Sequence, residues 1–209
     1  MMTVLSYLSA ILSGYLLGCS NMALYLSKYR GIDLRKAGTK NLGASNAMVQ
    51  LGWRAGILVG VHDIGKAFLA VLAAKLLCPE LPLIGASAGV ACVLGHMYPF
   101  YLKFQGGKGF AAYLGMTLAL NWRFALVVML IVVLVTLITD YIVVGTVTTV
   151  LSVPAYLGWT ERSPWLFFVL FIASAVILWK HRENYVRIYR GTEIGLRRAN
   201  RGDYRTTKR

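Results

Sequence analysis

Two glycine-rich segments contain the residue types that bind phosphate groups. The first spans 38–46, where glycines alternate with hydroxyl and amide side chains in the order Gly38, Thr39, Lys40, Asn41, Gly43, Ser45 and Asn46. Its backbone N–H groups and neutral donors suit an oxyanion, although an ordinary polar turn has a similar composition. The second spans 104–110 and places Lys108 among Gly106, Gly107 and Gly109, directly before an apolar stretch. Because glycines admit close approach and a helix N-terminus attracts anions, this segment is the stronger candidate phosphate site.

A third polar segment, 181–184, follows the last apolar stretch and contains His181 and Asn184. The chain has three histidines and three cysteines, and the spacing of neither type suggests a metal site. We therefore expect phosphate chemistry that uses no metal and no other cofactor.

The composition places these segments in a membrane protein. Of the 209 residues, 57% are hydrophobic and 14% charged, whereas a soluble domain carries about 25% charged residues. Stretches without Asp, Glu, Lys or Arg cover 1–27, 81–102, 109–122, 124–139, 141–160 and 163–179. Most approach the roughly 20 residues that a helix needs to cross a bilayer. We count 55–79 as a further span despite Asp63, Lys66 and Lys75, because intramembrane charges are tolerated where they face a polar interior.

The basic residues predict how these spans are oriented. They lie in three blocks, at 28–54, at 103–108 and from 180 to the end, and the positive-inside rule assigns all three blocks to the cytoplasm. This requires an even number of spans between the second and third blocks, so 109–139 must be two helices that turn at 121–123. We therefore expect an all-α integral membrane protein with seven transmembrane helices, its N-terminus outside and its C-terminus cytoplasmic. A helix that begins at 109 is short, which predicts a polar pocket at membrane depth.

The chain shows no internal repeat or linker, so we expect a single membrane-embedded domain over 1–209 that includes a basic cytoplasmic tail at 182–209. Arg197, Arg198 and Arg201 of this tail suit anionic lipid headgroups. The net charge of +14 is concentrated in blocks between apolar stretches, which does not fit a nucleic-acid-binding surface. In the predicted topology, the three polar segments share the cytoplasmic face and would meet a phosphorylated substrate at the lipid boundary.

In their order and spacing, these segments resemble the PlsY-type family of bacterial membrane acyltransferases, which transfer a fatty acyl group from acyl phosphate to glycerol 3-phosphate. The resemblance covers most of the chain, through 31–35, 38–46, Asp63 with Lys66, 94–96 followed by Pro99, 104–109, and 181–184 followed by 191–193. It implies the bacterial inner membrane, an active site that faces the cytoplasm, and formation of 1-acylglycerol 3-phosphate and inorganic phosphate as the first acylation of phospholipid synthesis.

The resemblance also implies roles for individual residues. His181, Asn184 and Lys108 would be catalytic, and Asp63, Lys66 and His96 would support the site. The substrate and its phosphate would be bound by the two glycine-rich segments, that is by Gly38, Thr39, Lys40, Asn41, Gly43, Ser45, Asn46, Gly106, Gly107, Lys108 and Gly109. Acyl phosphate carries a good leaving group, so no protein nucleophile is required. The general base is either His181 or a phosphate oxygen of the substrate, and His181 as a loop-orienting residue is a further alternative.

Three positions depart from the family pattern. Lys40 stands where the family usually has Gly, Val49 where it usually has Arg, and Val143 where it often has Ser. Loss of the Arg removes a bidentate phosphate contact, for which Lys40 is a candidate replacement. A paralogue with a different acceptor alcohol is the alternative.

Two other protein classes remain open. A transporter would account for Asp63 and Lys66 within an apolar stretch, although transporters usually show repeated halves and this chain shows none. A non-catalytic scaffold would account for Val49 and Val143. The expected partners are acyl phosphate, glycerol 3-phosphate and membrane lipids, with a soluble enzyme that makes acyl phosphate as a further candidate for the basic face.

Overall fold

The computed structural model describes residues 1–197, and its regular elements over that range are helices. The long helices are α1 (Met2–Cys19), α4 (Trp53–Leu77), α5 (Ile84–Met97), α6 (Phe110–Leu120), α7 (Trp122–Thr139), α8 (Ile142–Thr160) and α9 (Pro164–Lys180). The short ones are α2 (Met22–Arg30), α3 (Ala44–Leu51), the 3-10 helix η1 (Phe100–Leu102) and α10 (Arg182–Tyr189).

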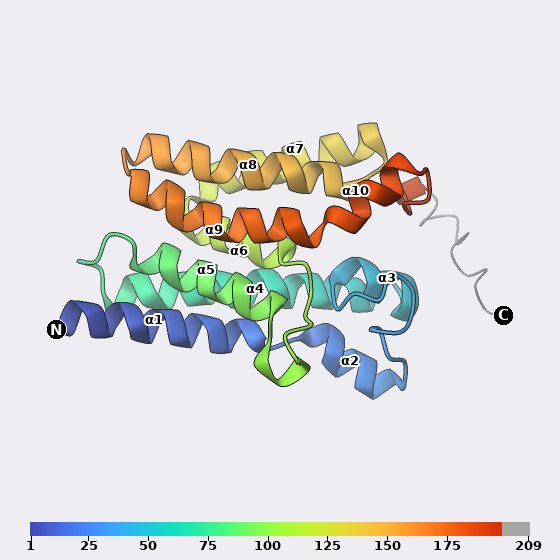
Figure 1. Ribbon diagram of the computed structural model, residues 1–209, viewed down its shortest axis with the longest axis horizontal. Coiled ribbons are helices and arrows are strands. Elements are labelled where there is room, and N and C mark those ends of the chain that lie inside the picture. The colour runs from blue at the N-terminus through green and yellow to red at the C-terminus, as the bar shows by residue number, and fades with distance from the viewer. Residues whose placement is uncertain (198–209) are drawn as a thin grey trace.

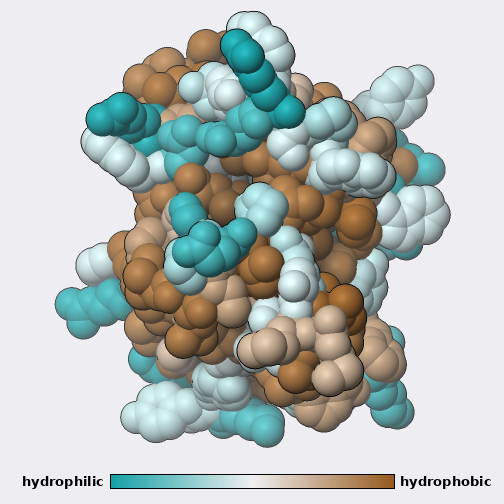
Figure 2. All heavy atoms as spheres, turned by 90° about the vertical axis from the view of Figure 1, so that its left-hand side faces the viewer, coloured by the Kyte–Doolittle hydropathy of each residue, from teal (hydrophilic) through white to brown (hydrophobic). Residues whose placement is uncertain are grey.

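The long helices lie side by side in one bundle and alternate in direction along the chain (Figure 1). α1 packs along α5, α4 contacts α5 and α6, and α8 contacts α7 and α9. The N-terminus lies at one end of the bundle, and α3 and α10 lie at the other (Figure 1). Figure 2 views the bundle from the N-terminal end, and apolar residues cover much of that surface between scattered hydrophilic ones.

Four helical stretches are long and apolar enough to cross a membrane: α1 together with α2, α4, α7 and α8. α9 and α10 form a fifth if the pair, bent by 44°, is counted as one span. The lipid-facing character is clearest in α7, whose large apolar side chains are exposed along its length, at Leu126, Val127, Leu130, Val133, Leu134 and Leu137. α5 has 14 residues and α6 has 11, both below the usual spanning length, so the count of seven spans remains a prediction.

The predicted break near residue 121 is confirmed. α6 ends at Leu120 and α7 begins at Trp122, and the Asn121 side chain caps α7 by accepting a hydrogen bond from the Phe124 N–H at 3.0 Å. With 11 residues and about 1.5 Å of rise per residue, α6 is far shorter than the roughly 30 Å hydrocarbon core of a bilayer. Figure 1 accordingly shows the connection between α5 and α6 near the middle of the bundle.

The first apolar stretch lies in one candidate span, Met2–Arg30, as expected, but its helix breaks at Ser20 between α1 and α2. Asn21 caps α2 by accepting from the Leu24 N–H at 2.9 Å. The carbonyl groups released at the break have partners from distant elements: Tyr101 Oη donates to the Cys19 carbonyl at 2.6 Å, and Lys66 Nζ donates to the Ser20 carbonyl at 2.7 Å. The break is therefore stabilised by tertiary hydrogen bonds within the bundle.

α1 and α5 approach each other closely because glycines face the contact. A Cβ added at Gly18 would overlap the Cys92 carbonyl, and one added at Gly95 would overlap the Tyr15 carbonyl. Small residues allow this approach of helix backbones within a membrane. α5 is consequently almost entirely buried, and carbonyl groups at its C-terminal end accept hydrogen bonds from the N–H groups of Gly106 and Gly107 in the second glycine-rich segment.

Candidate active site

Lys108 connects the second glycine-rich segment to the C-terminal part of the chain. Its Nζ donates a hydrogen bond to Asn184 Oδ1 on α10. Asn184 Nδ2 donates to Glu193 Oε1 at 2.6 Å, and Arg187 Nε donates to Glu193 Oε2, also at 2.6 Å. These four side chains, Lys108, Asn184, Glu193 and Arg187, form a continuous hydrogen-bonded chain that places an ammonium group directly before α6.

The environment of Lys108 lowers the pKa of its side chain. Burial, and to a smaller extent the positive charge of Arg187, lowers the pKa of Lys108 to about 8, against the opposing effects of Glu193 and Glu183. The side chain is partly buried rather than exposed. Its ammonium is therefore charged at neutral pH but weakly solvated, a state that favours an added phosphate oxygen as a partner.

His181 lies at the junction of α9 and α10, with its side chain buried. Its Nδ1 lies 2.8 Å from the Ile177 carbonyl oxygen. Since a carbonyl only accepts, Nδ1 carries the proton and Nε2 keeps the free lone pair. Burial lowers the pKa of His181 to about 4, and the charge of Lys108 contributes in the same direction. His181 is thus neutral at pH 7 and a weak base.

The loop 38–46 is organised around Asn46, which is fully buried. Asn46 Nδ2 lies within 2.9–3.1 Å of the carbonyl oxygens of Leu34, Ala37 and Asn41. Its Oδ1 accepts from the Thr39 N–H at 3.0 Å. The Asn46 side chain therefore stabilises the conformation of this segment through hydrogen bonds to its backbone. The side chains of Thr39, Lys40 and Ser45 are exposed.

Lys40 adopts left-handed backbone angles, with φ of 56°. Lys40, where the resemblance implies a glycine, therefore adopts the turn's left-handed angles at a cost of about 1–2 kcal/mol for an L-residue. Gly38, with φ of 57°, is the position where glycine is required, because a Cβ there would overlap the Asn46 and Gln50 side chains.

The two glycine-rich segments meet at Gly107. A Cβ added to Gly107 would lie 2.9 Å from the Leu42 carbonyl oxygen and would overlap the His96 ring. The structure thus brings together Gly107, Lys108, Asn184 and the Leu42 end of the first loop. No hydrogen bond within residues 1–197 joins Thr39, Lys40 or Ser45 to this centre.

Asp63, Lys66 and His96 form a buried polar cluster whose His96 ring lies against Gly107. Lys66 Nζ lies 2.9 Å from Asp63 Oδ1 and 2.9 Å from His96 Nδ1. Asp63 Oδ1 lies 3.3 Å from His96 Nδ1. The predicted pairing of Asp63 and Lys66 is therefore present, with His96 as its third member.

Sequence reasoning missed Glu193 and Arg187 as parts of the site. The segment 182–197, expected as part of a basic tail, is folded onto the bundle: Arg197 N donates to Asp140 Oδ1 at 2.8 Å, and Arg197 Nη2 to the Leu137 carbonyl at 3.1 Å. Arg198 and Arg201, predicted to bind lipid, lie outside the described residues. The sequence signal for Glu193 was its place in 191–193, one of the segments through which the chain resembles the family.

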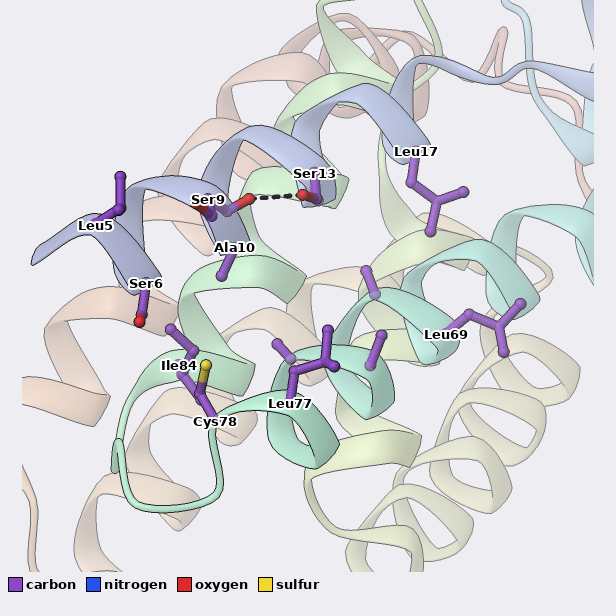
Figure 3. A pocket seen from close by; sticks show the side chains of 14 residues that line it. Leu5, Ser6, Ser9, Ala10, Ser13, Leu17, Leu69, Leu77, Cys78 and Ile84 are labelled. Carbon is purple, nitrogen blue, oxygen red and sulfur yellow. Dashed lines mark hydrogen bonds between the residues drawn. The ribbon is translucent and has the colours of Figure 1, made fainter. Parts of the chain in front are cut away.

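An apolar groove of about 350 Å³ lies elsewhere, between α1, the C-terminal half of α4 and the start of α5 (Figure 3). Its polar lining is mostly serine, and Ser13 Oγ donates to the Ser9 carbonyl of its own helix at 2.6 Å (Figure 3). Charged side chains are absent from its lining. The groove therefore offers no cationic side chain to a phosphate group.

The family model described as glycerol-3-phosphate acyltransferase matches residues 8–191. This range includes both glycine-rich segments, the Asp63, Lys66 and His96 cluster, and 181–187, but not Glu193. The chain belongs to the glycerol-3-phosphate acyltransferase family. Glycerol-3-phosphate acyltransferase 1 of Oceanobacillus iheyensis is 35% identical to it over 87% of this chain and 91% of that protein. A glycerol-3-phosphate acyltransferase of Coxiella burnetii is 36% identical over 90% of this chain and 97% of that protein.

A solved structure of the same family supports the fold. The crystal structure of PlsY, an integral membrane glycerol 3-phosphate acyltransferase in its glycerol 3-phosphate form, superposes with a TM-score of 0.86 at 32% identity, over 91% of this chain and 96% of PlsY. Membership in this family makes the chain a membrane acyltransferase of phospholipid synthesis. Of the positions that depart from the family pattern, Val143 is buried in α8 and Val49 is partly buried in α3.

Proposed function

We propose that this acyltransferase moves a fatty acyl group from acyl phosphate to the 1-hydroxyl of glycerol 3-phosphate, producing 1-acylglycerol 3-phosphate and inorganic phosphate. The observation that carries the proposal is the Lys108 ammonium, which the hydrogen bond to Asn184 holds next to Gly107. A weakly solvated cation beside glycine backbone suits a phosphate oxygen. The relatives named for glycerol 3-phosphate supply the acceptor.

The reaction requires little covalent chemistry from the protein. The acceptor hydroxyl oxygen attacks the acyl carbonyl carbon, the bond from that carbon to the bridging phosphate oxygen breaks, and the leaving phosphate takes the electron pair. The hydroxyl proton passes to the base and ends on phosphate. Lys108 and backbone N–H groups of the glycine-rich segments stabilise the negative charge that develops on the carbonyl and phosphate oxygens.

The pKa values favour a substrate phosphate oxygen as the base. A phosphate monoester has a second pKa of about 6, whereas that of His181 is lowered to about 4. The phosphate is then the stronger base by about 2 pKa units, and both are unprotonated at pH 7. His181, with Nδ1 bonded to Ile177, serves instead to orient substrate through its free Nε2.

The proposed topology has seven spans, an outer N-terminus and a cytoplasmic C-terminus in the bacterial inner membrane. The alternation of helix directions supports it, since the N-terminus and α10 lie at opposite ends of the bundle (Figure 1). The basic residues of α2 and α10 belong to the end that holds the candidate site. The positive-inside rule assigns that end to the cytoplasm, where a soluble enzyme that produces acyl phosphate has access.

A different acceptor alcohol is a second candidate, because Val49 and Val143 replace polar residues of the family pattern. The test is turnover by the purified protein with acyl phosphate and a panel of acceptors: glycerol 3-phosphate, glycerol and dihydroxyacetone phosphate. Formation of acyl product and inorganic phosphate in equal amounts with glycerol 3-phosphate supports the proposal. Formation of both products in equal amounts with another acceptor alone would show that this other alcohol is the acceptor. Acyl-CoA serves as a control donor.

A further inference from the structure

The His96 ring lies directly under the glycine-rich segment that carries Lys108. A Cβ added at Gly107 would overlap His96 Nε2 and lie 2.7 Å from Cε1, so the ring edge already fills the space beside the Gly107 Cα. The Gly107 N–H donates to the His96 carbonyl at 3.1 Å, and the Gly106 N–H donates to the Met97 carbonyl at 3.0 Å. The end of α5 therefore supports this segment through both backbone and side chain.

The orientation of the His96 ring is set from its other side. An ammonium group has three protons, and Lys66 Nζ has three acceptors within range: Asp63 Oδ1 at 2.9 Å, His96 Nδ1 at 2.9 Å and the Ser20 carbonyl at 2.7 Å. Each Lys66 proton thus has one acceptor. His96 Nδ1 also lies 3.3 Å from Asp63 Oδ1. Contacts from Lys66 and Asp63 to Nδ1 therefore fix the orientation of the ring, whose Nε2 lies next to Gly107.

Burial of the charged Asp63 and Lys66 side chains costs free energy of desolvation, which their pairing need not recover. Asp63, Lys66 and His96 are each at most 4% exposed. Replacement of a buried ion pair by apolar residues of similar size is often neutral or stabilising, so packing alone does not account for it. The side of the cluster that faces the candidate site is the edge of His96 against Gly107.

We propose that Asp63, Lys66 and His96 are positioning residues, which lock the His96 ring under Gly107 and thereby hold Lys108 against Asn184. The inference rests on the proposed role of Lys108 in binding phosphate. It assigns these groups no contact with substrate. A displacement of about 1 Å at a catalytic group costs on the order of 10²-fold in rate, so a small shift of the glycine-rich segment is sufficient.

The direct readout is the pH dependence of covalent modification of the Lys108 amine. The folded protein is labelled in detergent, and modification at Lys108 itself is then quantified by mass spectrometry. In the native protein, the pKa of Lys108 is lowered to about 8 from 10.5. His96→Ala is expected to move this midpoint toward 10.5, because the freed side chain becomes solvated, and to lower kcat/KM about 10²-fold. His62→Gln is the matched control, because His62 contacts Asp63 and Ser20 but not the glycine-rich segment. In this variant the midpoint of Lys108 modification should stay near 8.

Two further variants separate positioning from general damage. His96→Asn keeps an acceptor for Lys66 and removes only the ring edge under Gly107, and it substitutes for His96→Ala if that protein fails to fold. Gly107→Ala should inactivate the enzyme by collision with the ring. In the double variant with His96→Ala, the collision is relieved, so its activity should equal or exceed that of Gly107→Ala, a non-additive result.

An unchanged Lys108 midpoint in the folded His96 variants, or additive losses in the double variant, would overturn the inference. The modification experiment needs no substrate, so it gives a result even if transfer to glycerol 3-phosphate is absent. Absence of transfer in the native protein would instead reject the proposed function.

Discussion

Lys108 and Asn184 lie 76 residues apart in the chain, and the Lys108 ammonium donates a hydrogen bond to the Asn184 side-chain oxygen. This bond joins the start of α6 to α10, so the C-terminal segment must be folded before the ammonium group is in place. Glu193 and Arg187 extend the same chain of bonds. The cationic end of the candidate site is therefore built from tertiary contacts rather than from one local motif.

Asn184→Ala removes the only side-chain partner of the Lys108 ammonium among residues 1–197. We expect kcat/KM to fall about 10²-fold, because Lys108 loses its fixed position. Asn184→Asp keeps an acceptor but places a carboxylate beside Lys108 and Glu193, so it should raise the pKa of Lys108 and repel substrate phosphate. Steady-state kinetics of both variants checks this, and native kinetics in Asn184→Ala would show that the bond is not needed.

The pH profile of kcat/KM should fall on its alkaline side with a midpoint near 8. Lys108 is protonated below its pKa of about 8 and loses its charge above it, so phosphate binding is present below that pH and lost as pH rises through it. Lys108→Arg stays protonated throughout this range and should remove the alkaline limb, even where its activity is lower. A limb that survives unchanged in Lys108→Arg would assign it to another group.

Lys40→Gly should stabilise the first glycine-rich segment, because Lys40 adopts φ of 56°. The gain is at most about 1 kcal/mol, since glycine also loses more chain entropy on folding, and thermal unfolding in detergent measures it. If Lys40 replaces the family's Arg as a phosphate contact, the same variant raises KM for glycerol 3-phosphate. Lys40→Asn, which tolerates the same backbone angles without the charge, separates the two effects.

Val49→Arg introduces the cation that the resemblance implies for this position. With glycerol 3-phosphate as acceptor, we expect its KM to fall roughly tenfold or more, in line with about 1.5–3 kcal/mol for a hydrogen bond to a charged group. Val49→Leu, which adds bulk without charge, should leave the KM unimproved. An unaltered KM in Val49→Arg alongside better use of another acceptor would favour the different-acceptor alternative.

Local composition was sufficient to predict that the glycine-rich segment around Lys108 lies directly before a helix. The break at residue 121 was predicted from the positions of the basic blocks, which require two helices over 109–139, and the structure adds the Asn121 cap of the second helix. The break at Ser20 was not predictable, because its released carbonyl groups are satisfied by Lys66 and Tyr101 from other elements. Glu193 was missed for the same reason, since its partners become neighbours only when α10 folds back toward α6.

We expect this membrane acyltransferase to depend on Lys108 for transfer of an acyl group from acyl phosphate to glycerol 3-phosphate. The most direct test compares the native protein with Lys108→Met in detergent or lipidic phase, with inorganic phosphate and 1-acylglycerol 3-phosphate measured together. We expect equal amounts of both products from the native protein. In Lys108→Met we expect turnover to fall at least about 10²-fold, with thermal unfolding near that of the native protein. Native turnover in Lys108→Met, or phosphate release without acylated product in the native protein, would contradict it.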